Sequence, residues 1–172
     1  MESATDRIFV QASTDKLKQL AGRIQDCLGK LTADQVWSRG GDNENAIGNL
    51  VLHLCGNLRQ WIGSGVGGKP DIRVRDREFA ARGDIQPTEW AERLRATVDE
   101  AVGTVGQVTS ERLLERIAVQ KYDVTVLEAI FHVVQHFAEH TGQILFATKQ
   151  LTGKDLGYYR HLTQSAHHEK TP

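Results

Sequence analysis

The chain is poor in the features that mark several large protein classes. Its 172 residues include only two cysteines and three prolines. Because Cys27 and Cys55 both fall inside helical patterns, they do not form a disulfide scaffold, and we expect a reducing, cytoplasmic environment. No apolar run approaches the length of a membrane span, and the N-terminal residues lack the apolar segment of a signal peptide. The sequence therefore predicts no membrane partner.

An excess of charge of one sign is also missing. The 21 lysines and arginines are balanced by 22 aspartates and glutamates, for a formal net charge of -1. A protein that binds nucleic acid through its phosphates needs a surplus of positive charge, so we expect no nucleic-acid partner. The length suits one domain with a sizeable core.

Alternation of apolar and polar residues, the signature of strands, does not extend over a useful length, whereas apolar residues recur at helical spacing. We expect an all-α fold with long helices over about residues 5–30, 46–64, 87–105 and 125–151. Asn45, Pro87, Thr125 with Glu128, and Gly153 are suitable helix ends. A loop at 63–86, a short helix at 110–117 and an extended stretch at 118–123 connect them. This pattern predicts a four-helix bundle with a long crossover loop over residues 1–160, followed by a polar tail at 161–172.

Three histidines recur at a spacing of four in the last long helix. His140 lies within the apolar stripe of that helix, between Phe137 and Ile144, and His136 lies beside the stripe. His132 lies about 80° round the helix from His140. Two imidazoles one turn apart on an inward face are a metal-ligand arrangement. The alternative is that they are core or surface histidines with ordinary hydrogen bonds.

A further histidine, His53, lies at the edge of the apolar stripe of the second long helix, with Asn49 and Asn57 one turn to either side. Amide side chains in such positions can orient a histidine ligand. Sites in helical bundles are built from facing helices, so His53 can meet His136 and His140. Three neutral imidazoles with open positions are typical of a catalytic metal site. An ordinary boundary histidine is the alternative for His53.

The long loop from 63 to 86 carries Arg73, Arg75 and Arg77 among acidic residues. A long connection without secondary structure often has a function. One interpretation is an anion-binding rim beside the site, in which these arginines hold a substrate carboxylate. The other is a solvated loop whose charges pair with one another.

Four segments together resemble one known family. They are HLCGNLRQW at 53–61, SGVGG at 64–68, RDREF at 75–79 and HFAEHTGQI at 136–144. They are similar to the DinB-like (DNA-damage-inducible) metal-binding four-helix bundles, and most of all to an uncharacterised branch of that family. The resemblance covers about residues 5–160. It implies a divalent metal, often nickel or zinc, bound by His53, His136 and His140, commonly in a homodimer.

We expect the neighbouring polar residues only to support the ligands. His132 has no counterpart in the family pattern, so we expect it near the ligands or at the surface. The other candidates for orienting the ligands or a bound group are Asn49, Asn57, Glu139 and Gln143. Val66, Ile72 and Val74, apolar residues in the long loop, are candidates for the surface of a homodimer.

Relatives in this family include transferases that use low-molecular-weight thiols. The resemblance thus implies a metal-dependent transferase that activates a small thiol for attack on an electrophile. One alternative is a metal that only holds the bundle together. Another is a metal-dependent hydrolase, because His136-Phe-Ala-Glu139-His140 matches the inverted zinc-peptidase motif with Glu139 as general base. That class needs a further acidic ligand well downstream, where Asp155 and Glu169 are the only acidic residues after Leu151.

Overall fold

The structure is a computed structural model that describes residues 3–83 and 86–160. The predicted polar tail at 161–172, with His167 and His168, lies outside the described residues. The helices and strands are α1 (Ala4–Leu28), α2 (Ala33–Trp37), α3 (Ile47–Leu58), the π-helix η1 (Arg59–Val66), α4 (Arg75–Ala80), α5 (Pro87–Val105), α6 (Ser110–Leu114), β1 (Arg116–Val119), β2 (Tyr122–Thr125) and α7 (Val126–Thr152).

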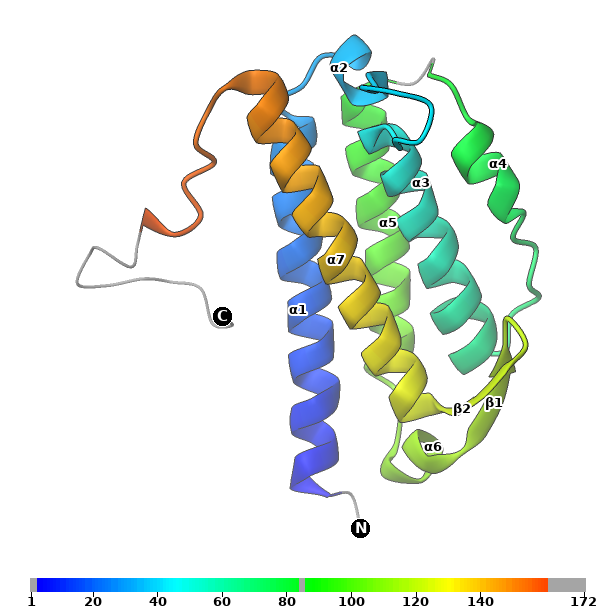
Figure 1. The fold of residues 1–172 in the computed structure, drawn as a ribbon. Coiled ribbons are helices and arrows are strands. Elements are labelled where there is room, and N and C mark those ends of the chain that lie inside the picture. The colour runs from blue at the N-terminus through cyan, green and yellow to red at the C-terminus, as the bar shows by residue number, and fades with distance from the viewer. Residues whose placement is uncertain (1–2, 84–85, 161–172) are drawn as a thin grey trace.

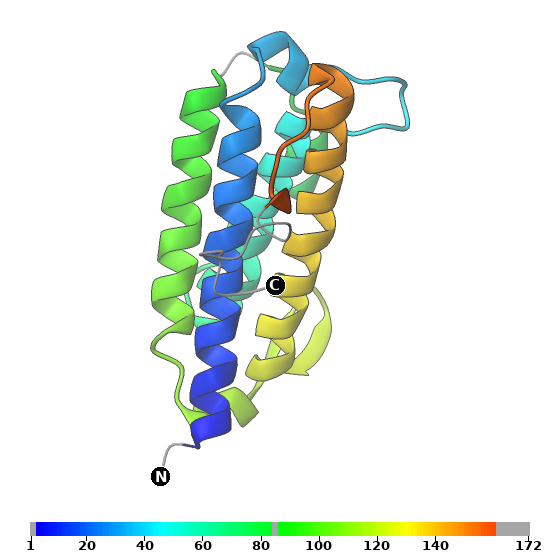
Figure 2. The same ribbon diagram turned by 90° about the vertical axis from the view of Figure 1, so that its left-hand side faces the viewer.

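The long helices α1, α3, α5 and α7 form a four-helix bundle, as the sequence predicts (Figure 1). Helix α1 packs against α5 and α7, and α3 packs against the same two helices. Figure 2 shows α1 between α5 and α7. Helices α1 and α7 run in one direction and α3 and α5 in the other (Figure 1). Because α3 and α5 are parallel, the chain between them must return along the length of the bundle, which is why the crossover is long.

The bundle encloses one apolar core to which each long helix contributes a face. Leu17 and Ile24 of α1, Leu54 of α3, Leu94 of α5 and Phe137 of α7 are at most 1% exposed. Burying a side chain of this size contributes roughly 1.5–3 kcal/mol. Within the described ranges, no helix is both long enough and apolar enough to cross a membrane.

The ends of α7 form at the residues that the sequence predicts. Thr125 and Glu128 make a capping box, in which Thr125 N donates to Glu128 Oε2 at 2.7 Å and Glu128 N donates to Thr125 Oγ1 at 3.2 Å. At the other end Gly153 has φ 64°, the left-handed conformation that favours glycine. The prediction of Asn45 as the cap of α3 is wrong, because Ala46 holds that position and donates to Asn49 Oδ1 at 3.2 Å.

The region predicted as a loop at 63–86 is partly helical. The π-helix η1 continues α3 as far as Val66, which is buried, so Val66 cannot belong to an exposed dimer surface. Helix α4 has only six residues, too few to be stable by itself. The amide nitrogen of Asn49 fixes it in place by donating to the carbonyl oxygens of Glu78, Phe79 and Ala81 at 2.8, 3.3 and 3.1 Å.

The segment before α7 contains a β-hairpin, which corrects the expectation of a chain without strands. The predicted helix at 110–117 ends at Leu114, and β1 and β2 pair antiparallel with Val119 opposite Tyr122. The turn residues Gln120 and Lys121 have φ of 52° and 69°. A two-residue turn with positive φ at both positions matches the twist of the strands, although glycine or asparagine usually occupies it. The hairpin lies beside the end of η1 (Figure 1).

Candidate metal centre

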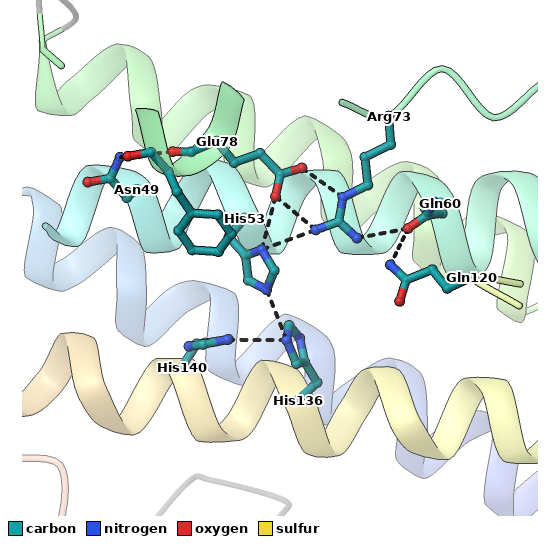
Figure 3. Close-up of polar contacts among 9 residues, drawn as sticks. Asn49, His53, Gln60, Arg73, Glu78, Gln120, His136 and His140 are labelled. Carbon is teal, nitrogen blue, oxygen red and sulfur yellow. Dashed lines mark hydrogen bonds and ion pairs between the residues drawn. The ribbon is translucent and has the colours of Figure 1, made fainter. Parts of the chain in front are cut away.

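Three histidines from two facing helices converge inside the bundle. His53 of α3 faces His136 and His140 of α7 (Figure 3). The Nε2 atom of His136 lies 3.1 Å from that of His53 and 3.2 Å from that of His140. Each of the three offers a ligand atom, and these atoms all lie within 4.8 Å of one another. The fold therefore brings together the three histidines singled out in the sequence.

The spacing of the nitrogens suits a shared divalent cation. Nitrogens about 2.0–2.1 Å from a common tetrahedral centre lie about 3.3–3.4 Å apart, close to the separations of His136 from its two neighbours. Burial, with smaller contributions from His140 and His53, lowers the pKa of His136 to about 3, so its imidazole is neutral at neutral pH. A histidine must be neutral in this way to bind a metal ion. Its Nδ1 is buried without a hydrogen-bond partner in the described chain, so its polar contacts all run through Nε2.

A carboxylate orients His53. Glu78 Oε2 lies 2.9 Å from His53 Nδ1, and both side chains are less than a tenth exposed. Arg73 Nη2 is 3.1 Å from the same nitrogen, but a guanidinium only donates, so the acceptor for an Nδ1 proton is Glu78. With the proton on Nδ1, the lone pair of Nε2 is directed toward the other two histidines. A carboxylate behind a histidine is a common way to orient a metal ligand.

Arg73 in turn holds Glu78. Its Nε donates to Oε1 at 2.7 Å and its Nη2 donates to Oε2 at 2.8 Å, a bidentate pair that is almost fully buried. Burial alone would raise the pKa of Glu78, but hydrogen bonds from Arg73 and His53 outweigh it and hold the pKa below its ordinary value. The third nitrogen, Nη1, donates to Gln60 Oε1 at 2.9 Å. Gly56 leaves room for the pair, because a Cβ there would lie 1.9 Å from Glu78 Oε1.

Glu78 is the functional residue that reasoning from the sequence missed. Its charge, like that of Arg73, looks solvated among the other charged residues of the crossover. In the structure, Arg73 and Glu78 do pair with each other, but in the interior and against a histidine. The signal that could have found Glu78 is the RDREF segment, part of the resemblance to the DinB-like family.

Two of the other candidate residues contact the three histidines. Gln143 Oε1 lies 2.7 Å from His140 Nδ1, so it can accept the proton there and leave Nε2 free, as Glu78 does for His53. The ring of His132 lies 5.7 Å from that of His136 and packs on Trp61 at 4.3 Å, centroid to centroid. His132 is outside the group of three converging histidines.

Three candidates have other surroundings. Asn49 anchors α4 through its hydrogen bonds, so its contact with the site runs through Glu78 rather than through His53. Asn57 is buried and lines a cavity beside the histidines. Glu139 is exposed, accepts from Gln135 Nε2 at 3.1 Å and is not part of the cavity wall.

The cavity has a volume of about 520 Å³ and lies between α3, α7, the crossover and the hairpin. Of the three arginines predicted to form a substrate rim, Arg73 and Arg75 line it and Arg77 does not. The lining residues are His53, Asn57, Trp61, Arg73, Arg75, Gln120, Tyr122, Val124, Glu128, His132 and His136.

Comparison with known proteins agrees with this architecture. Residues 4–163 match the family described as "Protein of unknown function (DUF1572)". The chain belongs to this family. No curated protein is significantly similar to the chain.

Solved structures with the same fold include proteins described as DinB-like. A DinB-like protein from Bacillus subtilis has a TM-score of 0.64 at 14% identity, over 88% of this chain and 96% of that one. A DinB-like protein from Bacillus cereus has a TM-score of 0.63 at 17% identity, over 83% and 90% of the two chains. A conserved protein from Enterococcus faecalis has a TM-score of 0.63 at 17% identity, over 84% and 97%. These comparisons confirm the DinB-like bundle.

Proposed function

We propose that this DUF1572 protein is a divalent-metal-dependent transferase that joins a low-molecular-weight thiol to an electrophile. The observation that carries the proposal is that the histidines meet at the wall of a cavity. His53 and His136 contribute both to the converging group and to the lining of the cavity of about 520 Å³. A site of three protein ligands keeps open positions for small molecules, and a cavity of this size accepts them.

The residues divide the work between holding the metal and orienting its ligands. His53, His136 and His140 would hold a nickel or zinc ion, since imidazole suits both. Glu78 and Gln143 set which nitrogen of His53 and His140 carries the proton. When bound, the metal would deprotonate a coordinated thiol at neutral pH, where a free thiol with a pKa of about 8.5 is mostly protonated.

The thiol must come from a substrate because the cysteines of the protein are unsuited to the reaction. Cys27 and Cys55 are buried, and burial raises the pKa of both thiols. In the proposed reaction the substrate sulfur forms a bond to an electrophilic carbon while the leaving group departs with its bonding electrons. The thiol proton is released to solvent.

Specific observations disfavour the two alternatives. A metal that only holds a bundle together usually has four protein ligands, whereas three ligating residues converge in the described chain. A hydrolase of the inverted zinc-peptidase type needs Glu139 beside the metal, but Glu139 is exposed and bonded to Gln135. The downstream acid Asp155 pairs with Arg160 at 3.0 Å, and Glu169 lies outside the described residues.

The proposal includes a homodimer in the cytoplasm. Ile72 and Val74 of the crossover are 85% and 51% exposed, which fits their predicted place in a dimer surface. Free, buried cysteines and a reduced thiol substrate suit a reducing compartment. Light scattering over a range of protein concentrations tests the dimer, and a constant mass of about 19 kDa would contradict it.

The activity is tested by turnover of generic electrophiles, a haloalkane and an epoxide, with a panel of low-molecular-weight thiols. Zinc-loaded and nickel-loaded protein are compared with the chelated protein and with His140→Ala. We expect metal-dependent turnover that is lost in His140→Ala. Equal rates in all samples across the whole panel would contradict the transferase.

Chelation followed by thermal unfolding separates the transferase from a metal that only holds the bundle together. The apolar core is packed by side chains alone, so we expect the chelated protein to remain helical and to unfold cooperatively. A chelated protein that loses its helical signal would favour the structural role, because metal binding would then be part of folding.

A further inference from the structure

One arginine that lines the cavity beside the histidines, Arg75, has no charged partner among the residues that the structure describes. Two of the lining residues are arginines, and Arg73 is bonded to Glu78 and Gln60 through all three of its nitrogens. Arg75 forms no ion pair in the described chain. Its guanidinium carbon lies 4.8 Å from the centre of the Phe79 ring, a contact that leaves the N–H groups available in the plane. Arg75 can therefore donate two parallel hydrogen bonds to a carboxylate.

The neighbouring Arg77 provides an internal comparison. It lies on the same short helix, α4, and carries the same charge. Two residues along a helix correspond to a rotation of about 200°, so the two side chains leave α4 on opposite sides. Both side chains are exposed, but Arg75 lines the cavity and Arg77 does not. A ligand in the cavity therefore meets Arg75 and not Arg77.

The hairpin side of the cavity is apolar and aromatic. The ring centroid of Trp61 lies 6.2 Å from that of Tyr122 and 4.3 Å from that of His132, and Val124 also lines the cavity. Tyr122 is 61% exposed, so a ligand in the cavity could cover part of its ring. A planar or apolar body bound there would pack against these side chains, mainly against Tyr122, because Trp61 is only 3% exposed.

One acidic residue, Glu128, lies in the wall of the cavity. Glu128 Oε2 accepts from Thr125 N at 2.7 Å and from Thr125 Oγ1 at 2.8 Å, and these bonds lower the pKa of Glu128, so the carboxylate is ionised. Glu128 precedes His136 by eight residues, about 12 Å along α7. A ligand carboxylate would be repelled by Glu128 and attracted to Arg75.

We propose that the cavity binds a small organic anion, with its carboxylate on Arg75 and its apolar body against Trp61 and Tyr122. The claim that this anion is a substrate of the transferase rests on the proposed function. The claim that the cavity binds the anion does not depend on turnover, so the binding site and the transferase activity can be disproved separately.

The test uses two probes of nearly identical shape, 2-naphthoate and its neutral amide, 2-naphthamide. Their affinities for the full, zinc-loaded chain are measured by calorimetry in the wild type, Arg75→Gln and the matched control Arg77→Gln. We expect Arg75→Gln to weaken 2-naphthoate by about tenfold, the effect of losing a charge-assisted contact, and to leave 2-naphthamide unchanged. Arg77→Gln should change neither by more than about twofold, because Arg77 leaves α4 on the other side and does not line the cavity. Equal losses in both variants, or none in Arg75→Gln, would overturn the proposal.

Two further measurements locate the two ends of the probe. Tyr122→Ser should weaken both probes by about the same factor, because it removes ring contact without changing charge. The preference for 2-naphthoate over 2-naphthamide should persist in the chelated protein. If chelation abolishes that preference and Arg75→Gln retains it, the carboxylate binds the metal instead and the proposal is wrong. Absence of turnover in every assay, with the Arg75 effect intact, would contradict only the transferase.

Discussion

The two sides of the histidine site are built in different ways. On one side, His136 and His140 come from a single helix, and the geometry of α7 alone sets their separation. On the other side, His53 of α3 is oriented by Glu78, 25 residues later, which reaches it from the short helix α4. The first arrangement is local in the sequence, whereas the second depends on how the crossover folds back over α3.

This difference indicates what the crossover contributes. A buried ion pair such as Arg73–Glu78 gives little net stability, because removing two charges from water offsets most of their attraction. Its clear structural effect is to hold an ionised carboxylate against His53 Nδ1. We therefore interpret α4 as the element that orients His53, while α7 presents His136 and His140 without hydrogen bonds from the described residues of the crossover.

The largest effect is expected from removing a ligand on either side. His53→Ala, His136→Ala and His140→Ala should each abolish stoichiometric metal binding, because two imidazoles remain of the three that converge. His132→Ala should retain the metal, since His132 lies outside that group. Metal analysis of the purified variants measures both outcomes. Loss of metal in His132→Ala together with retention in His53→Ala would show that the ligand set is wrong.

The next largest effect should come from the crossover side alone. Glu78→Gln removes the charge behind His53, and changes in such supporting partners typically weaken metal affinity by about 10- to 100-fold. Competition with a chelator of known affinity measures the change. Glu139→Gln is the matched control on α7, because Glu139 is close to His140 in sequence but exposed and bonded to Gln135. An equal loss in both variants would mean that net charge, rather than the contact with His53, controls affinity.

The same difference explains how far the sequence predicts the molecule. The start and end of α7 are predictable because a capping box and a left-handed glycine act within one helical turn. The i, i+4 spacing likewise predicts that His136 and His140 share a face. The convergence of His53 with them follows from helices that face each other in a bundle, although the spacing along the chain does not determine it.

What the sequence did not predict depends on tertiary contacts. Helix α4 buries only Glu78 in six residues, so it has no apolar stripe, and Asn49 fixes it from another helix. The strands of the hairpin have four residues each, too short for a clear alternation. Their turn has Gln120 and Lys121 where positive φ usually selects glycine or asparagine. Such segments take their structure from what they pack against.

The next effect concerns the histidines of α7. In the metal-free protein they should make the free energy of unfolding depend on pH. The pKa of His136 is about 3 in the folded protein, against an ordinary value of about 6.5. Between these values the unfolded chain binds a proton that the folded protein does not, so the free energy of unfolding rises with pH. The contribution of neutral His136 to the free energy of unfolding is complete above about pH 6.5 and is lost as the pH falls toward 3. Burial also lowers the pKa of His140, an effect of the same sign.

Urea unfolding of the chelated protein at several pH values measures this effect. The urea midpoint should stay nearly constant from about pH 7.5 to about pH 6.5 and then fall steadily toward about pH 5. His136→Asn, which cannot take up the proton, should show a shallower decline. If the wild type is equally stable across this range, protonation of His136 and His140 does not destabilise the folded protein as proposed.

The smallest effects are expected from replacing one glycine by alanine on each side of the site. Gly56→Ala on α3 would place a Cβ 1.9 Å from Glu78 Oε1 and 2.9 Å from Arg73 Nε. Because both side chains are buried and bonded to each other, they must shift together, and His53 loses part of its support. We expect metal affinity to fall by about threefold to tenfold, less than in Glu78→Gln, where the charge itself is lost.

Gly142→Ala on α7 is the matched substitution, one residue before Gln143 and two after His140. A Cβ there meets no atom within 4 Å, and alanine in a helix is more stable than glycine by about 0.5–1 kcal/mol. Urea unfolding should therefore show a gain of about that size, and chelator competition should show unchanged metal affinity. If Gly56→Ala also leaves affinity unchanged, the pair of Glu78 and Arg73 can move without consequence, and the two sides of the site do not differ in the way that their construction implies. A loss of affinity in Gly142→Ala would instead show that α7, too, needs precise support to present its histidines.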